Sequence, residues 1–188
     1  MEKINDLSTP CFILDPKELE RSVCGFQEAL NSKFRNSIVG YSVKTNSVPF
    51  CLKCVGKLGA YAEVVSSDEY ELALACGFDK GNIIYNGPLK SKETFIDAIL
   101  HGAIVNIETK RELSWLKELP HDKKYNVGLR VNINISQVSP EDADGENDNS
   151  RFGFSDETEE LKDALSFIEQ IDNVELAGLH IHRTTHSR

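Results

Sequence analysis

Residues able to act as nucleophiles, acids, bases or metal ligands lie within or at the ends of short apolar runs. They are Lys44, Glu63, Arg130, His180 and His182. Lys44 directly follows the apolar run 38–43, and burial at such a position lowers the pKa of a lysine and makes its amine a nucleophile. A strand-end lysine whose ammonium reaches solvent explains the same pattern. Position alone leaves both interpretations of Lys44 open.

Glu63 and Arg130 are charged residues inside apolar runs, where an unpaired charge is costly. Arg130 stands between Leu129 and Val131, and a buried arginine needs a carboxylate or a ligand. An ion pair inside the fold, with Glu63 as the partner, and a role in a functional site are both open.

His180 and His182 are two residues apart, so on one strand their side chains face the same way. His-x-His is a metal-ligand spacing, and His186 lies close by. The alternatives are a ring stacked on a ligand and a core histidine with its hydrogen bonds satisfied. The hydroxyls of Thr184 and Thr185 follow in a post-strand loop, where such groups can bind phosphate.

Strand and helix patterns alternate along the chain. The strand candidates are 38–43, 61–65, 83–86, 104–107, 127–132 and 174–182, with a short additional one at 9–14. The helix candidates begin at Asp15-Pro16 and lie near 48–58, 67–76, 92–101, 110–119 and 157–170. Capping-box spacing and C-terminal glycines mark several of them, at Ser66 with Glu69, Thr109 with Glu112, and Gly59, Gly77 and Gly102.

The strands are short, nearly continuous apolar runs, which are typical of parallel strands covered on both faces. Repeated βα units predict an α/β protein, either doubly wound or a (β/α)8 barrel. A doubly wound nucleotide binder has a glycine-rich turn after its first strand, whereas residues 44–49 contain no glycine. The sequence therefore favours a TIM-barrel type of fold, in which catalytic groups sit at the carboxyl ends of strands.

Composition and charge exclude several classes of protein. The 188 residues carry 21 Lys+Arg against 30 Asp+Glu, so a nucleic-acid partner is not expected. Residues 141–160 hold nine acids and one base, so the charge of −9 belongs to one segment, expected to be solvated. No apolar run approaches the roughly 20 residues of a membrane span. The start of the chain lacks the apolar stretch of a secretory signal.

Five cysteines, an odd number, without a secretory signal, predict reduced thiols in a cytoplasmic protein. Cys51 and Cys54 form a CxxC pair, but a zinc site needs about two further ligands. The pair lies inside a predicted helix, where residues i and i+3 share a face. Packing of small side chains is therefore favoured over chemistry.

Residues 41–46, Tyr-Ser-Val-Lys-Thr-Asn, resemble the Y-A-V-K-A-N motif of the fold-type III pyridoxal-phosphate decarboxylases, the family of diaminopimelate, ornithine and arginine decarboxylases. Further stretches match this family in order, namely 58–60, 63–66, 69–78, 83–88 with Lys90-Ser91, 106–108, 129–132, 150–153 and 178–182. Several motifs in one order are more specific than any single motif. The resemblance implies an alanine racemase-like barrel that binds pyridoxal 5'-phosphate.

The resemblance also implies roles for individual residues. Lys44 matches the lysine that forms the internal aldimine with the cofactor, and His182 matches the histidine that stacks on the pyridine ring. Glu63 matches an acidic position, usually aspartate, beside the aldimine. Arg130 matches an arginine close to the cofactor, and Thr185 matches a serine that contacts the phosphate. No metal ion is implied.

The phosphate-contacting end departs from the family pattern. Thr184 replaces a glycine, and Arg183 replaces an apolar residue. In the implied reaction, the substrate amine displaces Lys44, the pyridinium ring absorbs the electrons left by loss of the α-carboxylate, and Cα is then protonated. The substrate is expected to be an amino acid.

A complete (β/α)8 barrel takes about 250 residues, and six strand candidates run from residue 38 onward. Residues 1–188 are therefore expected to form a truncated N-terminal cofactor-binding barrel, without the C-terminal β domain of the family. Alone, the chain is expected to be inactive, with open sheet edges that invite pairing or aggregation. The full-length enzyme is expected to be a homodimer.

Three other interpretations stay open. An amino-acid racemase of the same fold is one, although alanine racemases usually continue K-A-N-A-Y-G-H-G, which the residues after Lys44 do not. A metal-dependent hydrolase using His180, His182 and His186 is another, although such barrels usually place His-x-His on the first strand. A truncated chain that regulates a full-length relative by mixed dimerisation is the third.

Overall fold

The computed structural model describes residues 8–134 and 152–182. The helices are α1 (Pro16–Asn31), α2 (Pro49–Lys57), α3 (Ser67–Ala75), α4 (Lys92–Leu100), α5 (Lys110–Trp115) and α7 (Glu159–Glu169), with short 3-10 helices η2 (Lys80–Asn82) and η3 (Leu116–Glu118). The strands are β1 (Gly40–Ser42), β2 (Tyr61–Ser66), β3 (Ile83–Leu89), β4 (Ile104–Ile107), β5 (Tyr125–Asn132), β6 (Phe154–Ser155) and β7 (Val174–His180).

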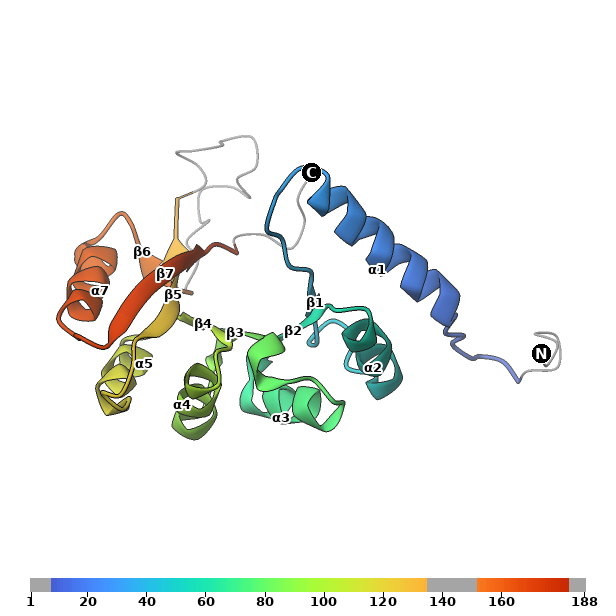
Figure 1. Cartoon of the computed structure of the whole chain (residues 1–188), viewed down its shortest axis with the longest axis horizontal. Coiled ribbons are helices and arrows are strands. Elements are labelled where there is room, and N and C mark those ends of the chain that lie inside the picture. The colour runs from blue at the N-terminus through green and yellow to red at the C-terminus, as the bar shows by residue number, and fades with distance from the viewer. Residues whose placement is uncertain (1–7, 135–151, 183–188) are drawn as a thin grey trace.

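The strands form one parallel sheet in the order β1-β2-β3-β4-β5, with β6 and β7 both pairing with β5. The sheet curves into an arc, and α2, α3, α4, α5 and α7 lie along its outer face (Figure 1). Among the described residues, β1 pairs only with β2 and β7 only with β5, so the arc is open. The α/β fold of barrel type, incomplete, is confirmed.

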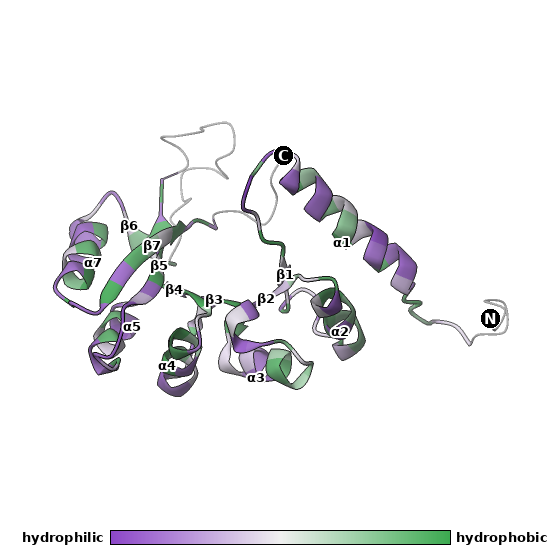
Figure 2. Cartoon of the chain, viewed as in Figure 1, coloured by the Kyte–Doolittle hydropathy of each residue, from purple (hydrophilic) through white to green (hydrophobic). Residues whose placement is uncertain are grey.

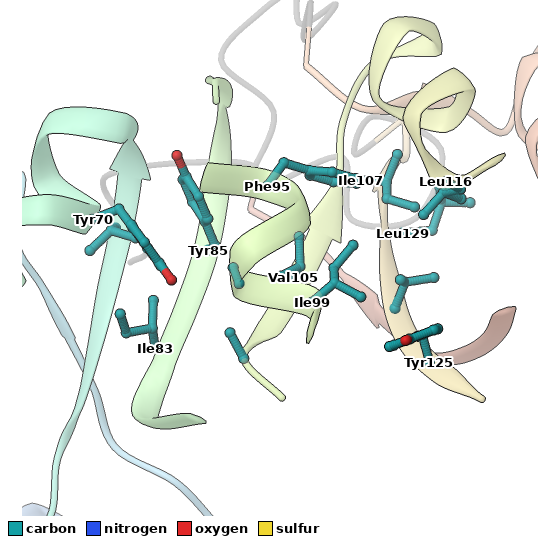
Figure 3. Close-up of a cluster of buried hydrophobic side chains, with 14 of the residues drawn as sticks. Tyr70, Ile83, Tyr85, Phe95, Ile99, Val105, Ile107, Leu116, Tyr125 and Leu129 are labelled. Atoms are coloured by element: carbon teal, nitrogen blue, oxygen red, sulfur yellow. The ribbon is translucent and has the colours of Figure 1, made fainter. Parts of the chain in front are cut away.

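The apolar core lies between the outer face of the sheet and the helices. Strand residues alternate, so Ala62 and Val64 are fully buried under the helices while Glu63 points to the other face and is half-buried. Stacked rings of Tyr70 and Tyr85, 5.3 Å apart, lie at one end of this core (Figure 3). Packing of this layer fixes where each strand ends, and therefore where each inner-face side chain stands.

The expectation that the strands are covered on both faces is wrong for the described residues. The inner face carries no second layer there, and Ile104 on it is 40% exposed. Apolar residues on the open face make the runs look continuous in sequence, which hides the alternation that the structure shows.

The predicted helix starts and ends are confirmed. The hydroxyls of Ser66 and Thr109 accept hydrogen bonds from the backbone N–H of Glu69 and Glu112, each at 3.2 Å. Gly59, Gly77 and Gly102 all have positive φ where helices end, a conformation that glycine adopts without strain. Cys51 and Cys54 lie within α2 as expected, and both thiols are free.

The strand expected at 9–14 does not form. Phe12, Ile13 and Leu14 are exposed, and no neighbouring strand among the described residues offers this segment a hydrogen-bonding edge. The last strand ends at His180 rather than at His182. The two-residue strand β6 was not predicted from the sequence, because so short a segment has no recognisable period.

Helix α1 forms as predicted, with Asp15 capping its first turn and accepting from the N–H of Lys17 at 2.9 Å. It stands apart from the other helices in Figure 1, and both hydrophobic and hydrophilic residues line it in Figure 2. Leu19 and Val23 pack partly against the core, whereas Phe26 is exposed. The apolar side chains of α1 are thus only partly covered by described residues.

The acidic segment at 136–150 and residues 183–188, which include Thr184, Thr185 and His186, lie outside the described residues. In the part that the structure describes, no helix combines the length and apolarity that crossing a bilayer requires.

Core packing gives a first prediction. Phe95 is fully buried and contacts Trp115 edge-on at 5.4 Å, so Phe95→Ala should lower the free energy of unfolding by about 3–5 kcal/mol. Phe26→Ala, at a side chain 58% exposed, should change it by no more than about 0.5 kcal/mol. Urea unfolding of both variants measures the difference, and equal effects would show that the core is not where the structure places it.

Candidate active site

Lys44 lies in the turn directly after β1, at the carboxyl end of the sheet. Thr45 N–H donates to Ser42 O at 3.2 Å, which closes the turn, and the fully buried Val43 anchors it to the core. The Lys44 side chain is exposed. Among the described residues no hydrogen bond or ion pair engages its ammonium, so Lys44 is a strand-end lysine that reaches solvent with its amine available.

Glu63 is held by a chain of amides on the inner face. Asn106 Nδ2 donates to Asn86 Oδ1 at 2.7 Å, and Asn86 Nδ2 donates to Glu63 Oε1 at 2.9 Å. This ladder runs from β4 through β3 to β2 and leaves Glu63 Oε2 free of a hydrogen bond to described residues. Glu63 pairs in register with Ser42, two residues before Lys44, so its carboxylate stands beside the end of β1.

The ladder needs a glycine on the next strand. A Cβ at Gly128 would lie 1.9 Å from Asn106 Oδ1, far inside van der Waals contact. The absence of a side chain at Gly128 therefore leaves the room in which Asn106 reaches Asn86.

Glu108 is the partner of Arg130, so the ion pair of Arg130 with Glu63, one of the two interpretations left open by the sequence, does not form. Glu108 Oε2 accepts from Arg130 Nη1 at 2.9 Å, with the two side chains almost fully buried. The difference arises because Glu108 directly follows β4, the neighbour of β5, whereas Glu63 lies on β2. Glu108 Oε1 also accepts from the N–H of Gly87 at the end of β3.

Arg130 is further fixed by two other contacts. Its Nη2 donates to the backbone carbonyl of His182 at 3.1 Å, and its guanidinium faces the Phe152 ring at 5.0 Å. A Cβ at Gly153 would lie 2.7 Å from Arg130 O, and Gly153 has a φ of +81°, so glycine is required there. The sequence stretch Phe152-Gly153 therefore packs on Arg130, and Arg130 positions the backbone of His182.

His180 and His182 point into the same region, with ring centroids 6.3 Å apart and planes tilted by 58°. Burial lowers the pKa of His182, and the positive charges of Lys44 and Arg130 lower it further against the carboxylates of Glu63 and Glu108. Burial also lowers the pKa of His180. Both imidazoles are therefore neutral near pH 7 and able to contact a ligand without a charge of their own.

His182 is within electrostatic range of Lys44, Glu63, Arg130 and Glu108. These groups lie on or just after β1, β2, β5 and β4, and His182 follows β7, so they belong to one region at the carboxyl edge of the sheet. The structure thus brings together four of the predicted site residues: Lys44, Glu63, Arg130 and His182. The fifth, Thr185, lies outside the described residues.

Metal binding finds no support among the described residues, where no group of three His, Cys, Asp or Glu side chains is arranged to hold an ion. His186, the third histidine of that hypothesis, lies outside the described residues. His180 Nδ1 is buried and has no hydrogen-bond partner there. A buried polar atom without a partner marks a place where a ligand group can supply the missing bond.

The sequence analysis gave no role to Asn86, Asn106 and Glu108, which lie in or directly after β3 and β4. The signal was available, because each is a polar residue closing an apolar run at the edge where barrel sites form. What the sequence did not contain was the pairing, since the partners are 20 to 23 residues apart along the chain.

Gly128 offers a test of the amide ladder. Gly128→Ala should lower the free energy of unfolding by about 1–3 kcal/mol, because the added methyl displaces Asn106. Gly178→Ala is the matched control, since Gly178 pairs with Gly128 in register and nothing lies within 4 Å of its added Cβ. Urea unfolding compares them, and a Gly128→Ala variant as stable as Gly178→Ala would contradict the ladder.

The lowered pKa of His180 gives a pH dependence with a definite sign. An unfolded histidine, with a pKa near 6.5, binds a proton before the folded one does. The contribution of His180 to the free energy of unfolding is therefore complete above the pKa of the unfolded state. It is lost as the pH falls through the lower pKa of the folded state. The slope of unfolding free energy against pH between 7 and 5 should be shallower in His180→Gln, and unchanged in the exposed control His121→Gln. Parallel slopes in wild type and His180→Gln would exclude the effect.

The chain was compared with known families and proteins. Residues 17–185 match the family described as pyridoxal-dependent decarboxylase, pyridoxal binding domain. The probable chloroplastic diaminopimelate decarboxylase of Oryza sativa subsp. japonica is 34% identical over 178 residues, which cover 93% of this chain and 35% of that protein. Diaminopimelate decarboxylase of Aquifex aeolicus is 31% identical over 159 residues, covering 82% of this chain and 37% of that protein.

Solved structures show the same fold. Diaminopimelate decarboxylase from Helicobacter pylori, complexed with L-lysine, gives a TM-score of 0.76 at 23% identity, covering 95% of this chain and 45% of that one. The enzyme from M. jannaschii gives 0.75 at 23% identity, covering 95% and 43%. The chain thus spans between a third and a half of the length of these relatives. It belongs to the pyridoxal-dependent decarboxylase family, and its matched residues are part of that family's pyridoxal-binding domain.

Proposed function

We propose that the natural protein is a pyridoxal-phosphate-dependent amino-acid decarboxylase, and that Lys44 is the residue that binds the cofactor covalently. The observation that carries the proposal is the convergence of Lys44, Glu63, Arg130 and His182 at one edge of the sheet. The family match supports it independently, because the matched region is a pyridoxal-binding domain.

The residues present fit such a cofactor. The amine of Lys44 is exposed and unpaired among the described residues, as a group that condenses with an aldehyde must be. His182 carries a neutral ring, which can lie against an aromatic plane without a charge to desolvate. The unpartnered buried Nδ1 of His180 points to a further polar group in the same region.

When bound, pyridoxal phosphate supplies an electron sink for the electron pair released as the substrate carboxylate leaves. Lys44 would provide the amine that holds the cofactor covalently. Oε2 of Glu63, which no described residue engages, would accept or return a proton at a nearby amine. His182 would contact the cofactor ring, and Arg130 holds the His182 backbone through its carbonyl.

The names of the relatives suggest which amino acid to assay first. The curated relatives reported above are named diaminopimelate decarboxylases, and their number makes meso-diaminopimelate the first amino acid to assay, with ornithine and arginine as comparisons. We further propose that residues 1–188 are the cofactor-binding portion of a longer enzyme that works as a homodimer. The share of the relatives that this chain spans, 35% and 37%, supports the longer enzyme.

Reductive trapping tests the role of Lys44. The full natural chain, mixed with pyridoxal phosphate, should absorb near about 420 nm, and borohydride should attach the cofactor covalently to Lys44, as located by peptide mass. Lys44→Ala should lose both signals, whereas Lys53→Ala, an exposed lysine on α2, should keep them. Attachment that is indifferent to Lys44 would overturn the proposal.

Release of CO2 then tests the reaction. Wild type should release it from at least one of the three amino acids, and Lys44→Ala should fall to background. Interconversion of enantiomers without CO2 release would instead identify a racemase of the same fold.

A further inference from the structure

A second buried ion pair lies behind the candidate active site and has no part in the roles described so far. Lys90 Nζ and Glu112 Oε2 are 3.2 Å apart, and both side chains are fully buried. Lys90 lies just before α4, and Glu112 lies in the first turn of α5. Because neither side chain has any exposed surface, a direct contact with a ligand does not explain the pair.

Stability alone is a weak explanation for such a pair. Taking two charges out of water costs free energy that their attraction only roughly offsets, and apolar replacements of similar volume are often neutral. Burial lowers the pKa of Lys90 and raises that of Glu112, which means that the buried surroundings disfavour the charged form of each side chain. The pair is therefore better explained by the backbone groups to which it hydrogen-bonds.

The pair holds the ends of two strands. Lys90 Nζ donates to Gly87 O at the end of β3, and Glu112 Oε2 accepts from the N–H of Glu108 just after β4, at 2.8 Å. Gly87 in turn donates its N–H to Glu108 Oε1. Gly87 and Glu108 are thus tied to each other directly and a second time through Lys90 and Glu112.

The backbone at Gly87 has little room to move if one of these hydrogen bonds is lost. Gly87 has a φ of +79°, and a Cβ there would lie 2.3 Å from Val65 O, so the backbone is already against β2. Glu108 Oε2 accepts a hydrogen bond from Arg130 Nη1 at 2.9 Å, and Arg130 Nη2 donates to the carbonyl of His182 at 3.1 Å. A shift of Glu108 would therefore move Arg130 and, through it, the backbone of His182. The Glu108–Arg130 hydrogen bond in this chain is almost fully buried, so water is not at hand to replace it.

We propose that Lys90 and Glu112 are positioning residues: their buried pair sets Glu108, and through Arg130 it sets the backbone of His182 against the cofactor. The inference rests on the proposed function and deepens it. It assigns the pair to cofactor affinity and geometry rather than to folding.

The test separates folding from cofactor binding in the full natural chain. The double variant Lys90→Met/Glu112→Leu should keep its unfolding midpoint within about 5 °C of wild type. Its Kd for pyridoxal phosphate, measured by absorbance titration, should rise by about tenfold or more because the site is misplaced. Borohydride trapping on Lys44 should slow in parallel.

The matched control is Lys92→Gln/Glu118→Gln. This ion pair joins the same two regions of the chain at 2.6 Å, but its side chains are 43% and 50% exposed. It should leave the Kd for pyridoxal phosphate and the unfolding midpoint unchanged. A buried-pair variant that binds the cofactor as tightly as this control would overturn the inference.

A gentler variant keeps the test decisive if the first one fails to fold. Lys90→Met/Glu112→Gln retains an acceptor for the Glu108 N–H and loses the two bonds of the Lys90 ammonium, to Gly87 O and to residue 112. Its Kd for pyridoxal phosphate should lie between those of wild type and of the leucine variant, or simply above wild type if the latter does not fold. Wild-type affinity in this variant would overturn the inference.

The two proposals fail in different ways. A wild-type chain in which pyridoxal phosphate is never trapped on Lys44 would overturn the proposed function, and this inference with it. Normal trapping in wild type, with unaltered binding in the folded buried-pair variants, would overturn the positioning role alone.

Discussion

A single buried carboxylate, that of Glu108, is the constraint on which the candidate site depends. In the low dielectric of the fold it must be fully hydrogen-bonded. It meets this requirement by accepting from the Gly87 N–H on one side and from Arg130 on the other. Because both donors belong to neighbouring strands, satisfying one charge aligns three strand ends. His182 is placed as a consequence, through the hydrogen bond from Arg130 Nη2 to its backbone carbonyl.

The two faces of the curved sheet have different roles. The outer face is an apolar layer without charges on the strands, exemplified by Val64, Tyr85 and Ile107, all fully buried. That layer is rigid because it is close-packed. The inner face carries amides and charges that hold one another, from Glu63 through Asn86 to Asn106. Polar groups can be aimed accurately there because the packing behind them leaves the strands little freedom.

Much of this arrangement follows from local sequence. The strand–helix alternation, the caps at Ser66 and Thr109 and the family motif around Lys44 depend on residues close together in the chain, so pattern reading finds them. The partner of Arg130 is 22 residues away, and only the strand order decides between Glu108 and Glu63. The segment at 9–14 fails for a related reason, since strand formation requires an edge that sequence composition does not reveal.

Two carboxylates near helix starts have a consequence for how this protein can change in length. Glu69 accepts from the Val65 N–H and Glu112 from the Glu108 N–H, each reaching back four residues from a helix to the strand before it. One inserted residue would turn the helix start by about 100° and carry the carboxylate away from its strand. The connections after β2 and β4 are therefore closed to insertions and deletions. New sequence has to enter elsewhere, as in the connection between Asn132 and Phe154.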